Sequence, residues 1–131
     1  MEKSKITIEH LLKSTSKNII WQLISTDAGL EKWIADSVVI DGKRLVCTWG
    51  DENRHHEVRE ATVEKHEKYG CIRWTWNDED DGSYVEIRMD KNNITGQYVL
   101  TVTDFTDDDD RDWLLNIWEH NFDRLRRSSG V

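Results

Sequence analysis

Apolar and polar residues alternate with a period of two along much of the chain, which predicts β-strands with one buried face. The chain contains no proline, so Gly, Asn and Asp must form the turns between these strands. The Asp41-Gly42 pair predicts a tight hairpin, and a shift of the alternation within 56–65 predicts a bulge. The expected strands cover residues 5–12, 38–40, 45–49, 56–65, 71–76, 85–89 and 98–103.

Two short segments after the first strand have the three-to-four-residue spacing of amphipathic helices. Ser14-Thr15-Ser16 offers candidate N-caps for the first helix, and Thr26 or Asp27 is the candidate N-cap of the second helix. Gly29 is unfavourable so early in a helix. The residues expected on the buried sides are Ile19, Ile20, Leu23 and Ile24 in the first helix, and Leu30, Trp33 and Ile34 in the second.

The segment from Thr106 to Val131 is predicted to form one long helix. Thr106 is a candidate N-cap, Asp107 to Asp110 place negative charge in the first turn, and arginines crowd the last. Its apolar face comprises Trp113, Leu114, Ile117, Trp118, Phe122 and Leu125, whereas Asn116, Glu119, His120 and Asp123 lie on the polar side. So aromatic a helix needs a large apolar partner, which the alternating strands supply, and the fold class is therefore α+β.

Length and composition indicate one domain spanning residues 1–131. Hydrophobic residues at 37% and seven tryptophans argue against disorder. A net charge of −8 argues against nucleic-acid binding, because the chain lacks an extended basic surface. The start lacks a signal-peptide core and no apolar run approaches the roughly 20 residues of a membrane span, so we expect a cytoplasmic protein without membrane insertion.

Three short motifs, in this order, carry a family resemblance. Trp33-Ile34-Ala35-Asp36 closes the second helix, Asp41-Gly42 forms the first hairpin, and Thr103-Asp104-Phe105 precedes the last helix. The chain thereby resembles the START-like (SRPBCC, Bet v 1-like) superfamily, and more narrowly bacterial START-like proteins related to Hsp90 ATPase activator homologues. The resemblance implies a helix-grip fold, in which a curved antiparallel sheet wraps the long C-terminal helix, two short helices follow the first strand, and a cavity lies between helix and sheet.

The strongest candidate site is that cavity. Small-molecule pockets are largely apolar with a few polar anchors, and the expected inner faces offer many aromatic residues. The same aromatic residues could instead fill a solid core, and both alternatives stay open. The candidate ligand-binding residues are His10, Trp33, Cys47, Trp49, Trp74, Trp76, Ile87, Leu100, Phe105, Trp113, Ile117 and Trp118.

Three other patterns give weaker indications of a metal site or a catalytic site. The segment from Asn77 to Gly82 resembles a calcium loop, but its twelfth position is Arg88 where a glutamate is required, and strands flank it. His55 and His56 are neighbours on a strand, so their side chains point to opposite faces. A Cys47–His10 nucleophile pair is conceivable, although a buried cysteine is usually inert.

Cys47 and Cys71 are expected to be reduced. We therefore predict no metal, no cofactor and no catalytic residue.

These observations leave three functional hypotheses. The first is a non-enzymatic module that binds a small apolar or amphipathic molecule, such as a lipid. The second is a protein-interaction module that resembles the Hsp90-activator homologues and contacts an Hsp90-type chaperone. The third and weaker one is a cyclase-like or hydrolase-like enzyme that uses the cavity. The expected oligomeric state is a monomer or a weak homodimer.

Overall fold

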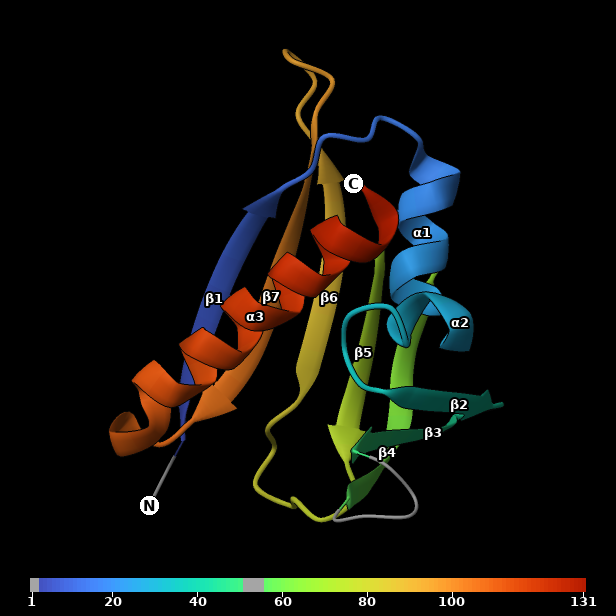
Figure 1. The fold of residues 1–131 in the computed structure, drawn as a ribbon. Coiled ribbons are helices and arrows are strands. Elements are labelled where there is room, and N and C mark those ends of the chain that lie inside the picture. The colour runs from blue at the N-terminus through green and yellow to red at the C-terminus, as the bar shows by residue number, and fades with distance from the viewer. Residues whose placement is uncertain (1–2, 51–55) are drawn as a thin grey trace.

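A computed structural model describes residues 3–50 and 56–131; the predicted turn at 51–54 and His55 lie outside this range. The described chain forms one antiparallel sheet of seven strands in the order β1-β7-β6-β5-β4-β3-β2, and the long helix α3 crosses its inner face (Figure 1). The predicted α+β helix-grip fold is thus confirmed. The elements are β1 (Ser4–Leu11), α1 (Lys17–Ser25), α2 (Asp27–Leu30), β2 (Ser37–Asp41), β3 (Arg44–Gly50), β4 (His56–Glu67), β5 (Cys71–Trp76), β6 (Val85–Lys91), β7 (Tyr98–Thr106) and α3 (Arg111–Ser129).

The strand predictions agree closely with the observed sheet. Asp41 and Arg44 pair across the β2–β3 hairpin, where Gly42 has φ of 60°. Glycine suits this turn because it adopts positive φ without a Cβ clash. The predicted bulge in β4 lies between Val63 and Lys65. The last strand, β7, pairs with the first strand, β1, which forms one edge of the sheet.

The two short helices begin where the capping residues predict. The Ser16 hydroxyl accepts a hydrogen bond from the Ile19 amide, and the Thr26 hydroxyl accepts one from the Gly29 amide. Two details differ from the prediction. Ile19 is exposed instead of buried, and α2 ends at Leu30. Trp33 and Ile34 therefore lie beyond the helix, but both are buried, and the Trp33 indole donates to the Leu23 carbonyl at 2.9 Å.

The start of α3 was predicted too early. Thr106 is the last residue of β7, where it pairs with Ser4, and its hydroxyl donates to the Asp107 carbonyl instead of capping a helix. Asp108–Asp110 form a separate 3₁₀ turn, and α3 begins at Arg111. Strand pairing with β1 extends the sheet past the point at which local sequence favours a helix. α3 ends at Ser129, and the following residue, Gly130, caps the helix in a left-handed conformation with φ of 73°.

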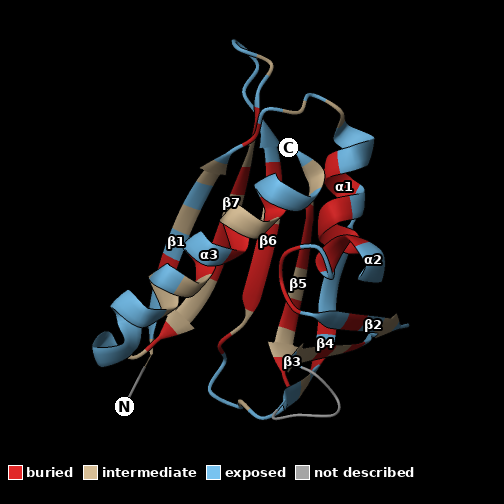
Figure 2. Cartoon of the chain, in the orientation of Figure 1, coloured by how far each residue is buried: buried red, intermediate tan, exposed pale blue. Residues whose placement is uncertain are grey.

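The core lies between the sheet on one side and the two short helices and α3 from Trp118 onward on the other (Figure 2). Trp118, Phe122 and Leu125 are buried there, and Trp33 packs edge-on against Trp118 and stacks on Phe122. By contrast, Trp113 in the first turn of α3 is 64% exposed, so the predicted apolar face is only partly covered. Among the described residues, no helix is long and apolar enough to cross a membrane.

Candidate functional site

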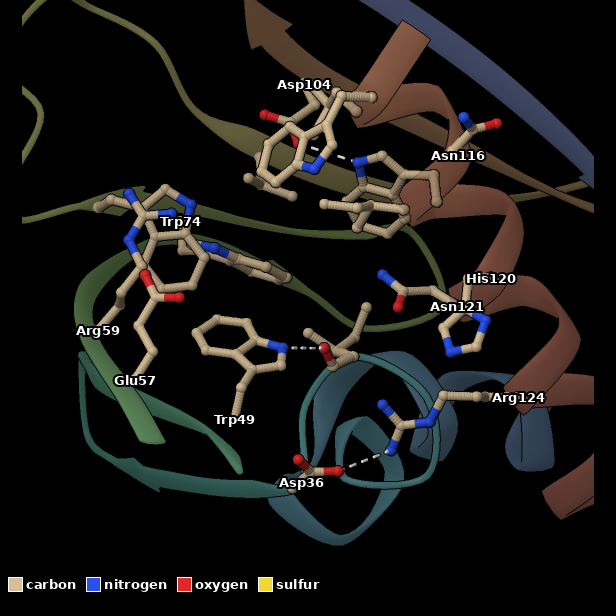
Figure 3. A pocket seen from close by; sticks show the side chains of 17 residues that line it. Asp36, Trp49, Glu57, Arg59, Trp74, Asp104, Asn116, His120, Asn121 and Arg124 are labelled. Carbon is tan, nitrogen blue, oxygen red and sulfur yellow. Dashed lines mark hydrogen bonds and ion pairs between the residues drawn. The ribbon is translucent and has the colours of Figure 1, made fainter. Parts of the chain in front are cut away.

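A cleft of about 850 Å³ opens between the N-terminal half of α3 and the inner face of the sheet (Figure 3). Strands β3 to β7 form its floor, and the segment before β2 closes one side. Most of its apolar wall is aromatic. Five indoles line it, and the lining tryptophans are Trp49, Trp74, Trp76, Trp113 and Trp118.

The structure places ten of the twelve candidate residues from the sequence in two groups. Six line the cleft, and they are Trp49, Trp74, Trp76, Trp113, Ile117 and Trp118. Four are fully enclosed in the core, namely Trp33, Cys47, Ile87 and Leu100. His10 does not line the cleft; it stacks on Phe122 with ring centroids 4.4 Å apart. Some of these aromatic residues therefore fill a core, and others border open space.

Phe105 corrects the sequence-based expectation directly. Asp104 lines the cleft, and successive side chains on a strand point to opposite faces, so Phe105 lies on the outer face of the sheet. There its ring meets Tyr84 edge-on, with centroids 4.9 Å apart. The alternation of Tyr98, Leu100 and Val102 already predicts that Asp104 lies on the inner face. It was not among the sequence-based candidates, because the search selected mainly apolar residues.

The cleft also contains polar residues that the sequence-based search missed. These are Asp36, Glu57, Arg59, Asp104, Asn116, His120, Asn121 and Arg124. Asn121 is buried on α3, and its amide points toward the cleft (Figure 3). A usable signal existed for this residue, because Asn121 follows Trp118 by three positions and Ile117 by four, which places it on the apolar face of the helix.

Asp104 is the most perturbed acid of the cleft. Its Oδ2 accepts a hydrogen bond from the Trp118 Nε1 at 2.9 Å, and its Oδ1 accepts one from the Phe105 amide at 2.8 Å. Burial nevertheless dominates and raises the pKa of Asp104 to about 6, because a charged carboxylate loses hydration there. Asp104 is thus an acid that titrates close to neutral pH inside an aromatic cleft.

Asp104→Asn is expected to remove a pH-dependent destabilisation. Between the ordinary Asp pKa of 3.8 and the folded-state pKa of about 6, the native state retains a proton that the unfolded state has released, so stability falls as pH rises. The isosteric variant cannot ionise, but its amide nitrogen cannot accept the second of these hydrogen bonds, so the substitution costs stability at both low and neutral pH. The stability of the variant relative to the parent should therefore improve by about 1–2 kcal/mol from low pH to neutral pH, allowing for water in the cleft. Urea denaturation of both proteins at both pH values checks this. An equal stability difference at the two pH values would contradict it.

Arg59 on β4 is held by acids and by an aromatic ring. Its guanidinium contacts the Asp78 carboxylate at 2.9 Å and that of Glu79 at 3.2 Å, and it stacks over the Trp76 ring at 4.2 Å. Glu79 also contacts Lys3 at 3.1 Å. The acidic segment after β5 therefore acts as a counterion group for Arg59 and Lys3.

The opposite wall of the cleft is fixed through the segment before β2. Arg124 on α3 contacts the Asp36 carboxylate at 3.6 Å and donates to the Ala35 carbonyl at 3.4 Å. The Trp49 indole donates to the Ile34 carbonyl at 3.0 Å (Figure 3). These contacts connect α3 and β3 to the segment before β2, so this wall of the cleft is held in place without a ligand.

The conceivable Cys47–His10 pair is not brought together. His10 is on β1 and Cys47 on β3, and four other strands lie between them in the sheet. Both cysteines are free, and burial raises the pKa of Cys47 to about 12, so its thiol is unreactive. Within residues 3–50 and 56–131, no three metal-ligating side chains gather into a cation site.

Comparison with known families decides the classification. The model of the START-like superfamily domain matches residues 1–131. The chain belongs to the START-like superfamily. A comparison with curated proteins gives no significant match.

Solved structures agree with this classification. A protein from Bacteroides fragilis, determined by solution NMR, shares 44% sequence identity over 97% of this chain and 91% of its own, with a TM-score of 0.65. A Staphylococcus aureus protein of unknown function is 15% identical over 97% of this chain and 93% of its own, with a TM-score of 0.76. The Aha1 dimer from Colwellia psychrerythraea is 17% identical over 77% of this chain and 75% of its own, with a TM-score of 0.58. The last two likenesses show the shared fold alone.

Proposed function

We propose that this START-like protein binds a small amphipathic molecule in the cleft beneath α3. The observation that carries the proposal is an open space of about 850 Å³ walled by five indoles and a few polar groups. Ligand pockets typically measure about 300–1,000 Å³ and combine apolar walls with a small number of polar anchors. Asp104 and Asn121 supply anchors of this kind, since both face the cleft from regular elements.

The chemistry of the cleft favours binding over catalysis. Cys47 is enclosed in the core and does not line the cleft, and the Asp104 oxygens already accept hydrogen bonds from Trp118 and Phe105. Neither arrangement provides a nucleophile next to a general base. A non-enzymatic binding module is therefore the function that these contacts support best.

Native mass spectrometry of gently purified protein, followed by tryptophan-fluorescence titration against lipids and aromatic compounds, tests this proposal. We expect a bound small molecule or a saturable fluorescence change, because the lining indoles would contact the ligand. Ile117→Trp should fill the cleft and weaken binding at least about tenfold by steric exclusion. Ile94→Trp is the matched control, because Ile94 is 95% exposed and lies outside the cleft. The absence of any bound mass and of any fluorescence change would contradict the proposal.

A role as partner of an Hsp90-type chaperone remains the second hypothesis. The likeness to the Colwellia Aha1 structure is a likeness of fold at 17% identity. The acidic exterior suits a basic partner surface, but acidity alone selects no particular partner. The cleft therefore gives small-molecule binding the stronger support.

A further inference from the structure

The cationic side chains of the cleft already have partners. Arg59 is paired with Asp78 and Glu79, and Arg124 with Asp36. An anionic ligand group would have to compete with these carboxylates for either guanidinium. The cleft is therefore poorly suited to hold a phosphate or a carboxylate.

The remaining carboxylates of the cleft are differently placed. Asp104 accepts hydrogen bonds from two neutral donors, the Trp118 indole and the Phe105 amide, and forms no ion pair within the part of the chain that the structure describes. Glu57 lines the cleft from β4, and among the described residues it forms no ion pair. A carboxylate withdrawn from water without a cation is unfavourable, and a positively charged ligand would supply the missing counterion.

The aromatic walls favour the same charge. Indole faces attract cations through the ring quadrupole, as the guanidinium of Arg59 over Trp76 already illustrates at 4.2 Å. Trp49 lies beside Trp76, with ring centroids 6.1 Å apart, and Trp113 on α3 is largely exposed. A flat ring entering the cleft would therefore meet several indole surfaces next to Asp104.

We propose that the ligand of this cleft is a small planar organic cation, a protonated aromatic or heteroaromatic amine whose ring packs against the indoles and whose charge lies beside Asp104. This inference rests on the proposed binding function and adds the charge and shape of the ligand. Asp104 and the aromatic walls provide the selectivity, while the paired arginines disfavour anions.

Two tricyclic probes of similar shape and opposite charge test the inference. Isothermal titration calorimetry compares 9-aminoacridine, a cation near neutral pH, with 9-anthracenecarboxylate, an anion. The cation should bind at least about tenfold more tightly, because it pairs with Asp104 whereas the anion is repelled. Measurements at about 150 mM salt screen the long-range attraction that a net charge of −8 exerts on any cation.

Charge variants localise the effect. Asp104→Asn should weaken binding of 9-aminoacridine about tenfold and leave the anion unchanged or slightly improved. Asp90→Asn is the matched control. It removes the same charge, but Asp90 is exposed on β6 and lies outside the cleft. Glu57→Gln at the exposed part of the cleft provides a second variant, with a smaller loss of cation affinity, should Asp104→Asn fold poorly.

The pH profile supplies a further readout. Affinity for 9-aminoacridine should rise between about pH 5 and about pH 8 as Asp104 ionises, and this rise should flatten in Asp104→Asn. Comparison with the variant distinguishes the contribution of Asp104 to the pH profile from that of the other charged or titratable groups. The groups that face Asp104 or share the cleft are Asp36, Glu57, Arg59, Glu79, His120 and Arg124.

Each outcome distinguishes the two proposals. Equal binding of both probes, or tighter binding of the anion, would overturn the cationic ligand class and leave the binding function intact. Cation binding that falls equally in Asp90→Asn and Asp104→Asn would also overturn it, since attraction would then be nonspecific. Failure of both probes, together with no bound mass in native spectra, would overturn the binding function itself.

Discussion

Replacing Trp118 with alanine is expected to lower the free energy of unfolding by about 3–5 kcal/mol, which is the typical cost of deleting a buried aromatic side chain. Trp118 is 4% exposed, and its ring lies 6.2 Å from the rings of both Trp33 and Phe122. The substitution also removes the indole donor to Asp104. Urea denaturation followed by far-UV circular dichroism measures the change.

Trp113→Ala provides the matched control for this experiment. It deletes the same side chain from the same helix, but Trp113 is 64% exposed, so the expected loss is below about 1 kcal/mol. A loss below about 1 kcal/mol for Trp118→Ala as well would show that Trp118 is not a core residue. A small loss at Trp113, together with weaker ligand binding, would agree with its place at the cleft.

Gly29→Ala is expected to destabilise the protein by about 3 kcal/mol or more, at the upper end of overpacking effects. A Cβ at this position would lie 2.0 Å from the Gln22 carbonyl oxygen and 2.7 Å from the Leu23 Cα. These are backbone atoms of α1, so the two short helices would have to separate. Helix propensity alone predicts the opposite, because alanine favours a helix over glycine by about 1 kcal/mol.

Thermal and urea unfolding of Gly29→Ala check this prediction. Gly70→Ala is the control, because the nearest atom to its new Cβ is 3.2 Å away and the loss should stay below about 1 kcal/mol. A stabilised Gly29→Ala variant would mean that α1 and α2 do not approach as closely as described.

Much of the fold could be predicted because strand and helix periodicity is local. The alternation in 71–76 predicted β5 with its bounds, and Ser16 and Thr26 marked the starts of both short helices. The boundary of α3 could not be placed in this way. Thr106 is a good N-cap by residue type, yet its pairing with Ser4, far away in the sequence, keeps it in the sheet.

The candidate site was only partly predictable for a related reason. A helical projection placed Trp113 and Trp118 on one apolar face, but it could not show that the sheet covers Trp118 and leaves Trp113 exposed. Similarly, Cys47 and His10 both point inward from their strands, whereas the strand order separates them. The sequence-based search favoured aromatic residues and so passed over Asp104, although alternation along β7 placed it inward.

The sequence by itself determined the order of the elements, the inward faces of most strands and the membership of the START-like superfamily. These properties depend on residues that are close in the chain or on motifs in a fixed order. Only the tertiary structure decided which indoles fill the core and which border a cleft. It also decided that Arg59 and Arg124 form ion pairs, whereas Asp104 forms none with the residues that the structure describes. The physical reason is that burial and ion pairing depend on partners distant in sequence, such as Asp36 and Arg124, which only the folded chain brings together.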